Sequence, residues 1–161
     1  MVLPVSYSIN LKFDKQTVWS IISKPGNLNY FHPFCKSNKV NCWESNKHED
    51  VLEYLNGIVL HREFYKWHEG EGYELNIGRE NGGKSKVIWS ISGEKITKLK
   101  ITVYPHVLSR YNKLKYILAY ILFIRPGLKK YLKSVLNGVK WHLENEKTTP
   151  RNQFGKHKWF S

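Results

Sequence analysis

Apolar and polar side chains alternate from Val5 to Phe13, and this period of two predicts a half-buried β-strand. Asp14 follows as a candidate helix N-cap. Four apolar residues after it share one helical face, which predicts a helix: Val18, Trp19, Ile21 and Ile22. A Pro-Gly pair at Pro25 ends that helix, and a short second helix is expected over 28–31 before Pro33.

A series of strand-like segments occupies the middle of the chain, and turn signals recur about every ten residues. Asn56-Gly57 and Asn81-Gly82-Gly83 are two of these signals. The spacing predicts an antiparallel meander of about six strands. The expected strands cover 39–44, 51–55, 58–68, 73–77, 87–91 and 99–103.

The period changes to a helical one after Pro105. A first apolar helix is expected over 111–121, and Arg125-Pro126-Gly127 should interrupt it because proline blocks helix continuation. Pro126 then opens an amphipathic helix that runs to about Glu146. Its apolar face repeats at steps of three and four residues: Leu128, Leu132, Val135, Leu136, Val139 and Leu143.

This order of elements resembles the START-like, Bet v 1-like superfamily, also called SRPBCC, and within it the polyketide cyclase/dehydrase-like group. Three stretches carry the resemblance: residues 13–25 with Asp14, Val18-Trp19 and Pro25; Ser85-Lys86-Val87-Ile88-Trp89; and the closing helix, 128–144. It covers most of residues 3–146. The apolar segment 109–124 and the tail after Glu146 depart from the usual pattern.

The resemblance implies an α+β helix-grip fold, in which a curved antiparallel sheet wraps around the long C-terminal helix and encloses a cavity. We therefore expect one domain over 1–146, with 109–124 as an apolar helical insertion, and a basic aromatic tail over 147–161. It also implies a hydrophobic or amphipathic small molecule as ligand, such as a lipid or a polyketide-like compound. The alternative that it implies is an enzyme of the cyclase/dehydrase type.

Strand alternation predicts which side chains face the cavity. Arg62 and Lys66 should prefer solvent, which would turn Glu63 inward, where it either pairs with His61 or an arginine or orients a ligand. A slip of one residue would exchange the two faces. The expected ligand-binding residues are His61, Glu63, Tyr65, Trp67, Tyr73, Leu75, Val87, Trp89, Ile91, Leu99, Ile101, Val103, Leu132, Val135, Leu136 and Val139.

Candidate catalytic groups are sparse. His61 and Glu63 in the cavity and His32 at its mouth are the acid/base candidates. Neither a metal-binding motif nor a nucleotide-binding glycine loop is present, so we expect no metal site and no cofactor. Cys35 and Cys42 lack a redox spacing and are expected to be free thiols.

The chain of 161 residues has a formal net charge of +13, and this charge is uneven. Residues 1–108 hold 14 basic and 11 acidic residues, whereas 109–161 hold 12 basic and 2 acidic. The basic, apolar region 109–133 suggests a second alternative, a lipid carrier at an anionic membrane surface; packing on the sheet or a homodimer contact would equally explain its apolar segment. Nucleic acid is an unlikely partner because the tail has no recognised nucleic-acid-binding motif.

The sequence has neither a signal peptide nor an apolar run close to the roughly 20 residues that a membrane-spanning helix needs. We therefore expect a cytoplasmic protein.

Overall fold

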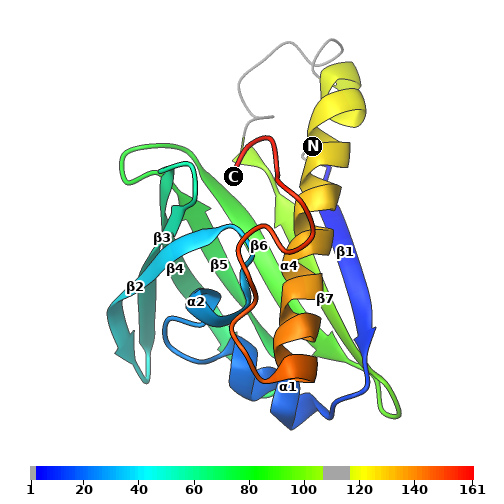
Figure 1. The fold of residues 1–161 in the computed structure, drawn as a ribbon. Coiled ribbons are helices and arrows are strands. Elements are labelled where there is room, and N and C mark those ends of the chain that lie inside the picture. The colour runs from blue at the N-terminus through cyan, green and yellow to red at the C-terminus, as the bar shows by residue number, and fades with distance from the viewer. Residues whose placement is uncertain (1–2, 107–116) are drawn as a thin grey trace.

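The computed structural model describes residues 3–106 and 117–161, and the predicted α+β helix-grip fold is confirmed (Figure 1). Strand β1 (Val5–Leu11) is followed by two short helices, then by six consecutive strands, and the chain ends in a long helix and a tail. The remaining elements are α1 (Lys15–Ile22), α2 (Leu28–Phe31), β2 (Cys35–Glu44), β3 (Lys47–Tyr54), β4 (Val59–His68), β5 (Gly72–Gly78), β6 (Lys84–Ser92), β7 (Thr97–Tyr104), the π-helical turn η2 (Tyr120–Ile124) and α4 (Arg125–Asn145).

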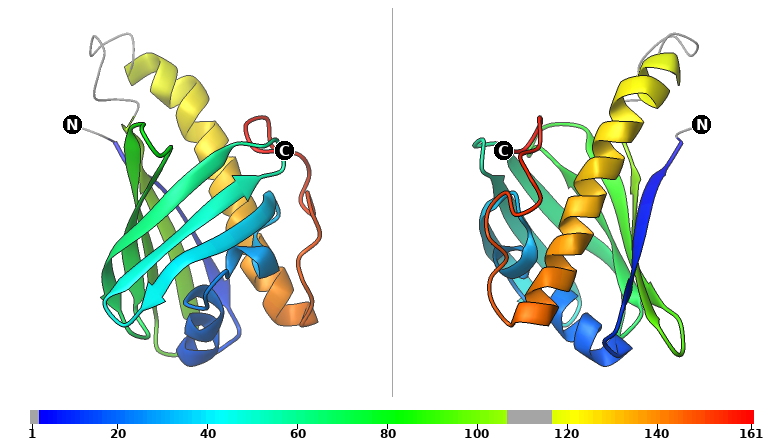
Figure 2. Two further views of the ribbon diagram at one scale, coloured as in Figure 1. Left: turned by 90° about the vertical axis from the view of Figure 1, so that its left-hand side faces the viewer. Right: turned by 45° about the vertical axis from the view of Figure 1, so that its right-hand side comes forward.

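All seven strands form one antiparallel sheet in the order β1-β7-β6-β5-β4-β3-β2. Figure 2 shows the sheet curving around α4, which crosses its concave side. Register irregularities contribute to the curvature, because a bulge bends and twists its strand. They occur twice in β2 and once in β4, between Phe64 and Lys66.

The two short helices close one end of the curved sheet. Asp14 caps α1 as predicted, and its carboxylate accepts a hydrogen bond of 2.8 Å from the backbone N–H of Thr17. Helix α2 approaches α4 so closely that a Cβ added at Gly138 would lie 2.1 Å from the carbonyl oxygen of Phe31. Glycine at this position lets the two helices touch.

The expected interruption at Arg125-Pro126-Gly127 is wrong. Residues 117–119 are helical, and the chain runs through η2 into α4 without a break. Proline in a helix clashes with the carbonyl group four residues earlier, here that of Leu122. The wider π-helical turn lies immediately before α4 and gives this carbonyl room, so the helix continues past Pro126.

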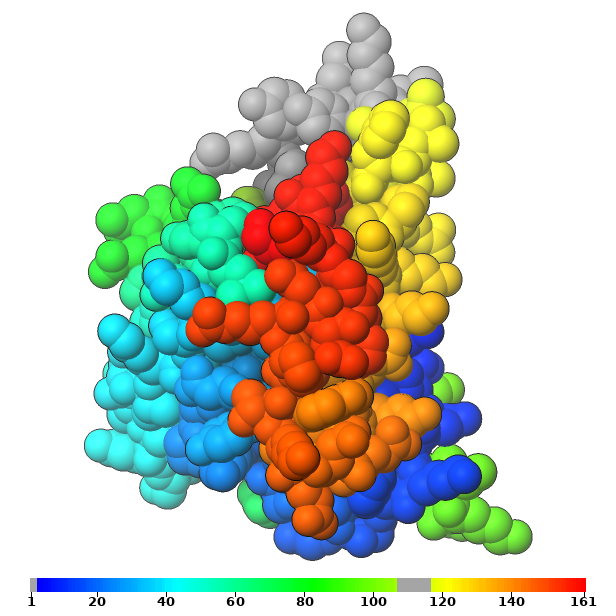
Figure 3. Space-filling model, viewed as in Figure 1, coloured from blue at the N-terminus to red at the C-terminus, as the bar shows by residue number. Residues whose placement is uncertain are grey.

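The C-terminal tail lies against the domain, between α4 and the α2–β2 region (Figure 3). The backbone N–H of Thr149 donates to the carbonyl oxygen of Tyr30 at 2.8 Å, and that of Asn152 donates to the carbonyl oxygen of Pro33 at 2.8 Å. Near its end, Trp159 covers Gly127 of α4, where a Cβ would lie 2.4 Å from the indole ring. The tail therefore forms part of the folded structure.

Candidate functional site

The concave face of the sheet is filled at one end. Six rings pack there as an aromatic cluster, with Trp67 stacked on His48 at a centroid distance of 4.1 Å and on Tyr73 at 5.3 Å. Trp19 of α1 meets Trp67 edge-on at 5.3 Å, and its indole N–H donates to Glu69 at 2.6 Å. The aromatic cluster comprises Trp19, Trp43, His48, Phe64, Trp67 and Tyr73.

The other end of the concave face is hollow. A cavity of about 300 Å³ lies between the sheet, α2, α4 and the tail. Its walls are mainly aliphatic and aromatic, as in sites for apolar small molecules. The apolar lining consists of Leu28, Leu52, Leu60, Leu75, Ile77, Val87, Trp89, Ile101, Val103, Leu128, Leu132, Val135 and Phe160.

Three polar side chains of the cavity wall form a hydrogen-bonded row, the hydroxyl chain. His32 follows α2, Tyr54 ends β3 and Tyr131 lies on α4, so three separate elements meet here. His32 Nε2 and Tyr54 Oη each lie 2.9 Å from Tyr131 Oη. The other imidazole nitrogen, Nδ1, accepts the backbone N–H of Phe34 at 3.2 Å, which places the proton of the neutral ring on Nε2.

The hydroxyl chain has one hydrogen more than it uses. Nε2–H and the two tyrosine hydroxyls supply three donors, but only two hydrogen bonds link the three groups. His32 donates to Tyr131, and one of the two hydroxyl hydrogens then has no acceptor among residues 3–106 and 117–161. The wall of the apolar cavity can therefore offer a hydrogen bond to an oxygen atom of a bound molecule.

Burial keeps the hydroxyl chain uncharged. Desolvation, with a smaller effect of the Arg62 charge, lowers the pKa of His32 to about 3. Desolvation likewise raises the pKa of Tyr54 to about 12, and raises that of Tyr131 well above its ordinary value. At neutral pH the three groups are a neutral imidazole and two phenols.

Arg62 of β4 is a buried charged group of the cavity wall. Its guanidinium is buried, and Nε donates to Asp50 Oδ1 at 2.7 Å while Nη2 donates to Asp50 Oδ2 and to Asn27. The neighbouring Asp50 carboxylate favours the charged form, so the pKa of Arg62 is raised although burial opposes this.

The third nitrogen of Arg62 is not used within the protein. Among the described residues, Nη1 has no hydrogen-bond partner. Every fully enclosed side-chain nitrogen or oxygen of the described residues has a hydrogen-bond partner. Because Nη1 has none, it is accessible from open space, and Arg62 lines the cavity. Its two hydrogens are further donors for a bound molecule.

The mouth of the cavity is more polar than its interior. Gly82, Gly83 and Arg79 belong to the β5–β6 turn, and Ser85 Oγ lies 3.1 Å from His106 Nδ1. Phe160 of the tail covers the opposite side, where its ring stacks on Tyr54 at a centroid distance of 4.4 Å. The tail thus contributes directly to the cavity wall.

The predicted inward faces of β5, β6, β7 and α4 are buried, although only part of each lines the cavity. Tyr73 instead belongs to the aromatic cluster, and Ile91, Leu99, Leu136 and Val139 are buried away from the cavity. The predicted residues that do line it are Leu75, Val87, Trp89, Ile101, Val103, Leu132 and Val135.

The predicted faces of β4 are wrong over most of the strand. Arg62 is 3% exposed, whereas Glu63 forms an ion pair with Lys84 at 2.5 Å on the other side of the strand. His61 lies on that outer side too, and Tyr65 is exposed and donates to Glu74. The bulge between Phe64 and Lys66 shifts the alternation by one residue, so Trp67 alone of the four predicted residues points inward, into the aromatic cluster.

Arg62 is buried for a physical reason that the alternation of apolar and polar residues cannot reveal. An arginine is placed in a core only when a partner compensates its charge, and Asp50 of the neighbouring strand is that partner. Tyr54 and Tyr131 were missed as site residues, although Tyr131 lies among the predicted residues of the closing helix and Tyr54 lies in an expected strand. Tyr54 lies two residues after Leu52, and Tyr131 precedes Leu132 and lies four residues before Val135.

Of the three acid/base candidates, His32 alone lines the cavity, while His61 and Glu63 face away from it. No group of three or more potential metal ligands occurs among residues 3–106 and 117–161. Cys35 is buried, and burial raises the pKa of its thiol to about 12, which makes it a poor nucleophile. Within the same residues, no helix is long and apolar enough to span a membrane.

Solved structures of low sequence identity share the helix-grip fold of this chain. No protein-family model and no curated protein sequence matches this chain. TTHA0849 from Thermus thermophilus is similar with a TM-score of 0.70 and 13% identity, over 89% of this chain and 99% of that one. DynU16, encoded in the dynemicin biosynthetic locus, has a TM-score of 0.66 and 12% identity over 92% of this chain. The di-domain ARO/CYC protein BexL has a TM-score of 0.66 and 10% identity over 89% of this chain.

The present chain spans 50% of the length of DynU16 and of BexL. At these identities the similarity establishes the fold, and the function has to be argued from the cavity itself.

Proposed function

We propose that this protein binds one small molecule with an apolar body and at least one hydrogen-bond-accepting oxygen, in the cavity between the sheet and α4. The observation that carries the proposal is the pairing of apolar walls with unused donors. Arg62 Nη1 and one hydroxyl hydrogen of the hydroxyl chain are available in a space of about 300 Å³.

Each part of such a ligand has a counterpart in the wall. Burial of apolar surface stabilises a complex by roughly 25 cal/mol per Å². The oxygen determines orientation, since a hydrogen bond from a charged donor contributes about 1.5–3 kcal/mol and an unsatisfied buried acceptor is costly. A carboxylate, an enolate or a carbonyl group next to an aromatic or aliphatic body fits this description.

The ligand class can be tested with 2-naphthoate, which joins two fused rings to a carboxylate. Quenching of tryptophan fluorescence is a suitable signal because Trp89 lines the cavity. We expect saturable binding of one molecule per chain. Naphthalene, which has the same rings and no oxygen, should bind at least about tenfold more weakly because it leaves the donors unused.

Matched variants on α4 locate the binding site. Leu132 lines the cavity, whereas Leu143 lies near the far end of the same helix. Leu132→Trp should fill part of the cavity and abolish saturable 2-naphthoate binding, and Leu143→Trp should leave it unchanged. Equal affinities of both variants and the original chain would show that the probe binds elsewhere and would overturn the proposal.

A cyclase- or dehydrase-type reaction in the same cavity is the second candidate, supported by the fold shared with BexL and by the position of His32 in the wall. With Nδ1 engaged by Phe34 and a pKa of about 3, His32 acts there as a hydrogen-bond donor rather than as a general base. Organic extraction of the purified protein, followed by incubation of the extracted compound with fresh protein, separates the candidates. An unchanged mass with an unchanged chromatographic retention time supports binding. A new retention time at the same mass supports cyclisation, and loss of water supports dehydration.

A further inference from the structure

The start of the long helix carries a surface unlike any other part of the described chain. Five large apolar side chains are exposed there within seven residues: Ile117, Leu118, Ile121, Leu122 and Phe123, the apolar patch. Phe123 is 71% exposed and Leu118 is 62% exposed. Contiguous exposed apolar residues of this kind usually mark an interaction site.

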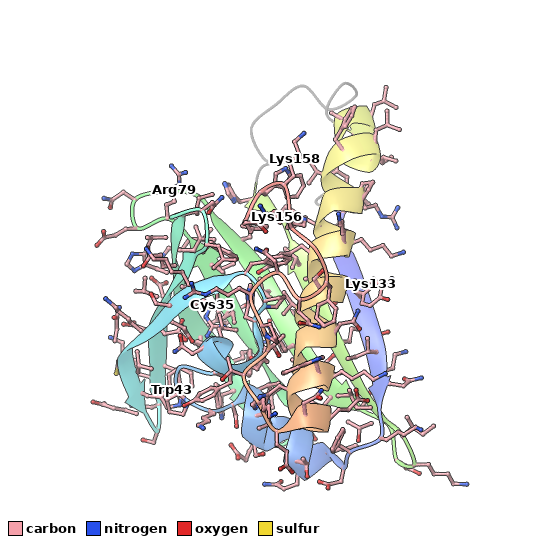
Figure 4. All side chains as sticks on the ribbon, in the orientation of Figure 1. Cys35, Trp43, Arg79, Lys133, Lys156 and Lys158 are labelled. Carbon is pink, nitrogen blue, oxygen red and sulfur yellow. The ribbon has the colours of Figure 1, made fainter. Side chains whose placement is uncertain are left out.

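Positive charge surrounds the apolar patch. Arg125, Lys129 and Lys130 follow it on α4 and are exposed, and no acidic residue occurs from Ile117 to Leu143. The tail adds Lys156 and Lys158 at the same end of the molecule (Figure 4). Contact between His157 Nε2 and the carbonyl oxygen of Gly127, at 3.0 Å, holds this part of the tail beside the first turn of α4.

The cavity opens toward this end of the molecule. Leu128 lines the cavity and lies five residues after Phe123 on the same helix. The β5–β6 turn, which carries Arg79 at the cavity mouth, reaches the same end (Figures 1 and 4). A surface bound to the apolar patch would therefore lie close to the route by which a ligand enters.

We propose that this end of the molecule docks onto an anionic lipid bilayer, with the apolar patch inserted at the interface and the surrounding lysines and arginine against lipid headgroups. The charge pattern favours this partner, because apolar side chains combined with positive charge are the signature of interfacial helices. A second copy of the chain would bring two sets of like charges together. The inference rests on the proposed function in one respect: the bilayer would be where the apolar ligand is exchanged.

Co-sedimentation of the full chain with phosphatidylcholine vesicles, with and without phosphatidylserine, tests the proposal. We expect binding to the mixed vesicles that weakens with salt, and little binding to phosphatidylcholine alone. Leu122→Ser with Phe123→Ser should weaken binding at least tenfold, because serine removes apolar area without adding charge. Lys129→Gln with Lys130→Gln should weaken it about fivefold for each charge removed.

Ile96→Ser is the matched control, since Ile96 is 58% exposed in the β6–β7 turn at the opposite end of the sheet. It should bind vesicles like the original chain. Three results would overturn the proposal: equal binding of all variants, no sedimentation with either vesicle, or a dimer in light scattering that the double serine variant dissociates. Binding of 2-naphthoate by the double serine variant reports the cavity separately, so failure of docking is distinguishable from failure of the proposed function.

Discussion

The concave face of one sheet has two ends that differ in how the space beneath α4 and α1 is used. At the filled end, the contacting rings of the aromatic cluster have centroids 4.1–6.3 Å apart. At the hollow end, the apolar side chains do not fill the space between the sheet and α4, and a cavity of about 300 Å³ remains. The presence of aromatic side chains does not by itself distinguish the ends, since Trp89 and Phe160 also line the cavity.

The two ends of the concave face differ in how their polar groups are hydrogen-bonded. At the filled end the indole N–H groups of Trp19 and Trp67 both donate to Glu69, and the hydroxyl of Tyr73 donates to the carbonyl oxygen of Ile22. At the hollow end, Arg62 Nη1 and the hydroxyl chain keep donors that the described residues leave unused. Unused donors cost stability unless something occupies the space. We therefore expect the filled end to determine the stability of the fold and the hollow end to determine binding.

The largest expected effect is at the boundary between the two ends, where Arg62 lies over the ring of Phe64 at 5.1 Å and is paired with Asp50. Asp50→Ala should lower the free energy of unfolding by about 3–5 kcal/mol, because it leaves a buried charge without its partner. Urea denaturation measures this loss.

Adding Arg62→Met to Asp50→Ala should recover much of the stability, since the uncompensated charge is then gone. Glu53→Ala, which removes the exposed pair with Lys36, serves as the control and should change stability far less. A double variant no more stable than Asp50→Ala would mean that the ion pair is not the cause of the loss.

A second effect arises from pH and tests whether the hollow end excludes charge. Because burial lowers the pKa of His32 to about 3, the folded chain leaves this ring neutral where the unfolded chain, with a pKa of about 6.5, takes up a proton. Stability is therefore retained above about pH 6.5 and lost as the pH falls toward 3, by up to about 1.4 kcal/mol per pH unit.

The His32→Gln variant should lack this part of the pH dependence. Urea denaturation of both proteins at several pH values gives the difference in slope directly, and other titrating groups cancel in the comparison. Parallel stability curves below about pH 6.5 would mean that the folded protein also accepts the proton, and that the wall around His32 is open to water.

The sequence allowed the fold to be predicted because the fold depends on periodicity. Alternation over 5–11, the Asp14 cap and the repeat from Leu128 to Leu143 each correspond to an observed element. These signals are local, and each reflects the burial of one face of a single element. The order of these elements resembles that of a known superfamily, and this resemblance, not periodicity, supplied the helix-grip architecture.

The site was harder to predict because it depends on pairs of residues on different strands. Alternation treats Arg62 as a solvent residue, and only its contact with Asp50, twelve positions away, makes burial favourable. A single bulge after Phe64 then reverses the faces within one strand. His32 was predicted at the mouth, but its link to Tyr131 joins residues 99 positions apart, and no local pattern contains that contact.

A third test compares two valines one turn apart on α4. Val135 lines the cavity, whereas Val139 is equally buried outside it. Val139→Phe should lower the free energy of unfolding by about 1–3 kcal/mol, because a larger ring has no room in a packed region. Val135→Phe has free space beside it and should cost less, while 2-naphthoate binding is lost.

Thermal and urea denaturation measure the two stabilities, and Val135→Ala controls for the loss of the original side chain. Equal destabilisation by the two phenylalanine variants would mean that the cavity is no more able to accept a ring than the packed region. The distinction between a filled and a hollow end would then fail.

The smallest expected effect is the difference in stability between phenylalanine variants of the two tyrosines in the hydroxyl chain. Tyr131→Phe removes the central oxygen and leaves the Nε2–H of His32 without its partner, at a cost of about 1–3 kcal/mol. Tyr54→Phe removes an end of the row, and Tyr131 can then turn its own hydrogen into the cavity, so the loss should be about 1 kcal/mol or less. A double-mutant cycle by urea denaturation gives the coupling between the hydroxyls. Equal losses for the two single variants would contradict the proton arrangement, because only the central oxygen accepts from the imidazole and shares a hydrogen with the second phenol.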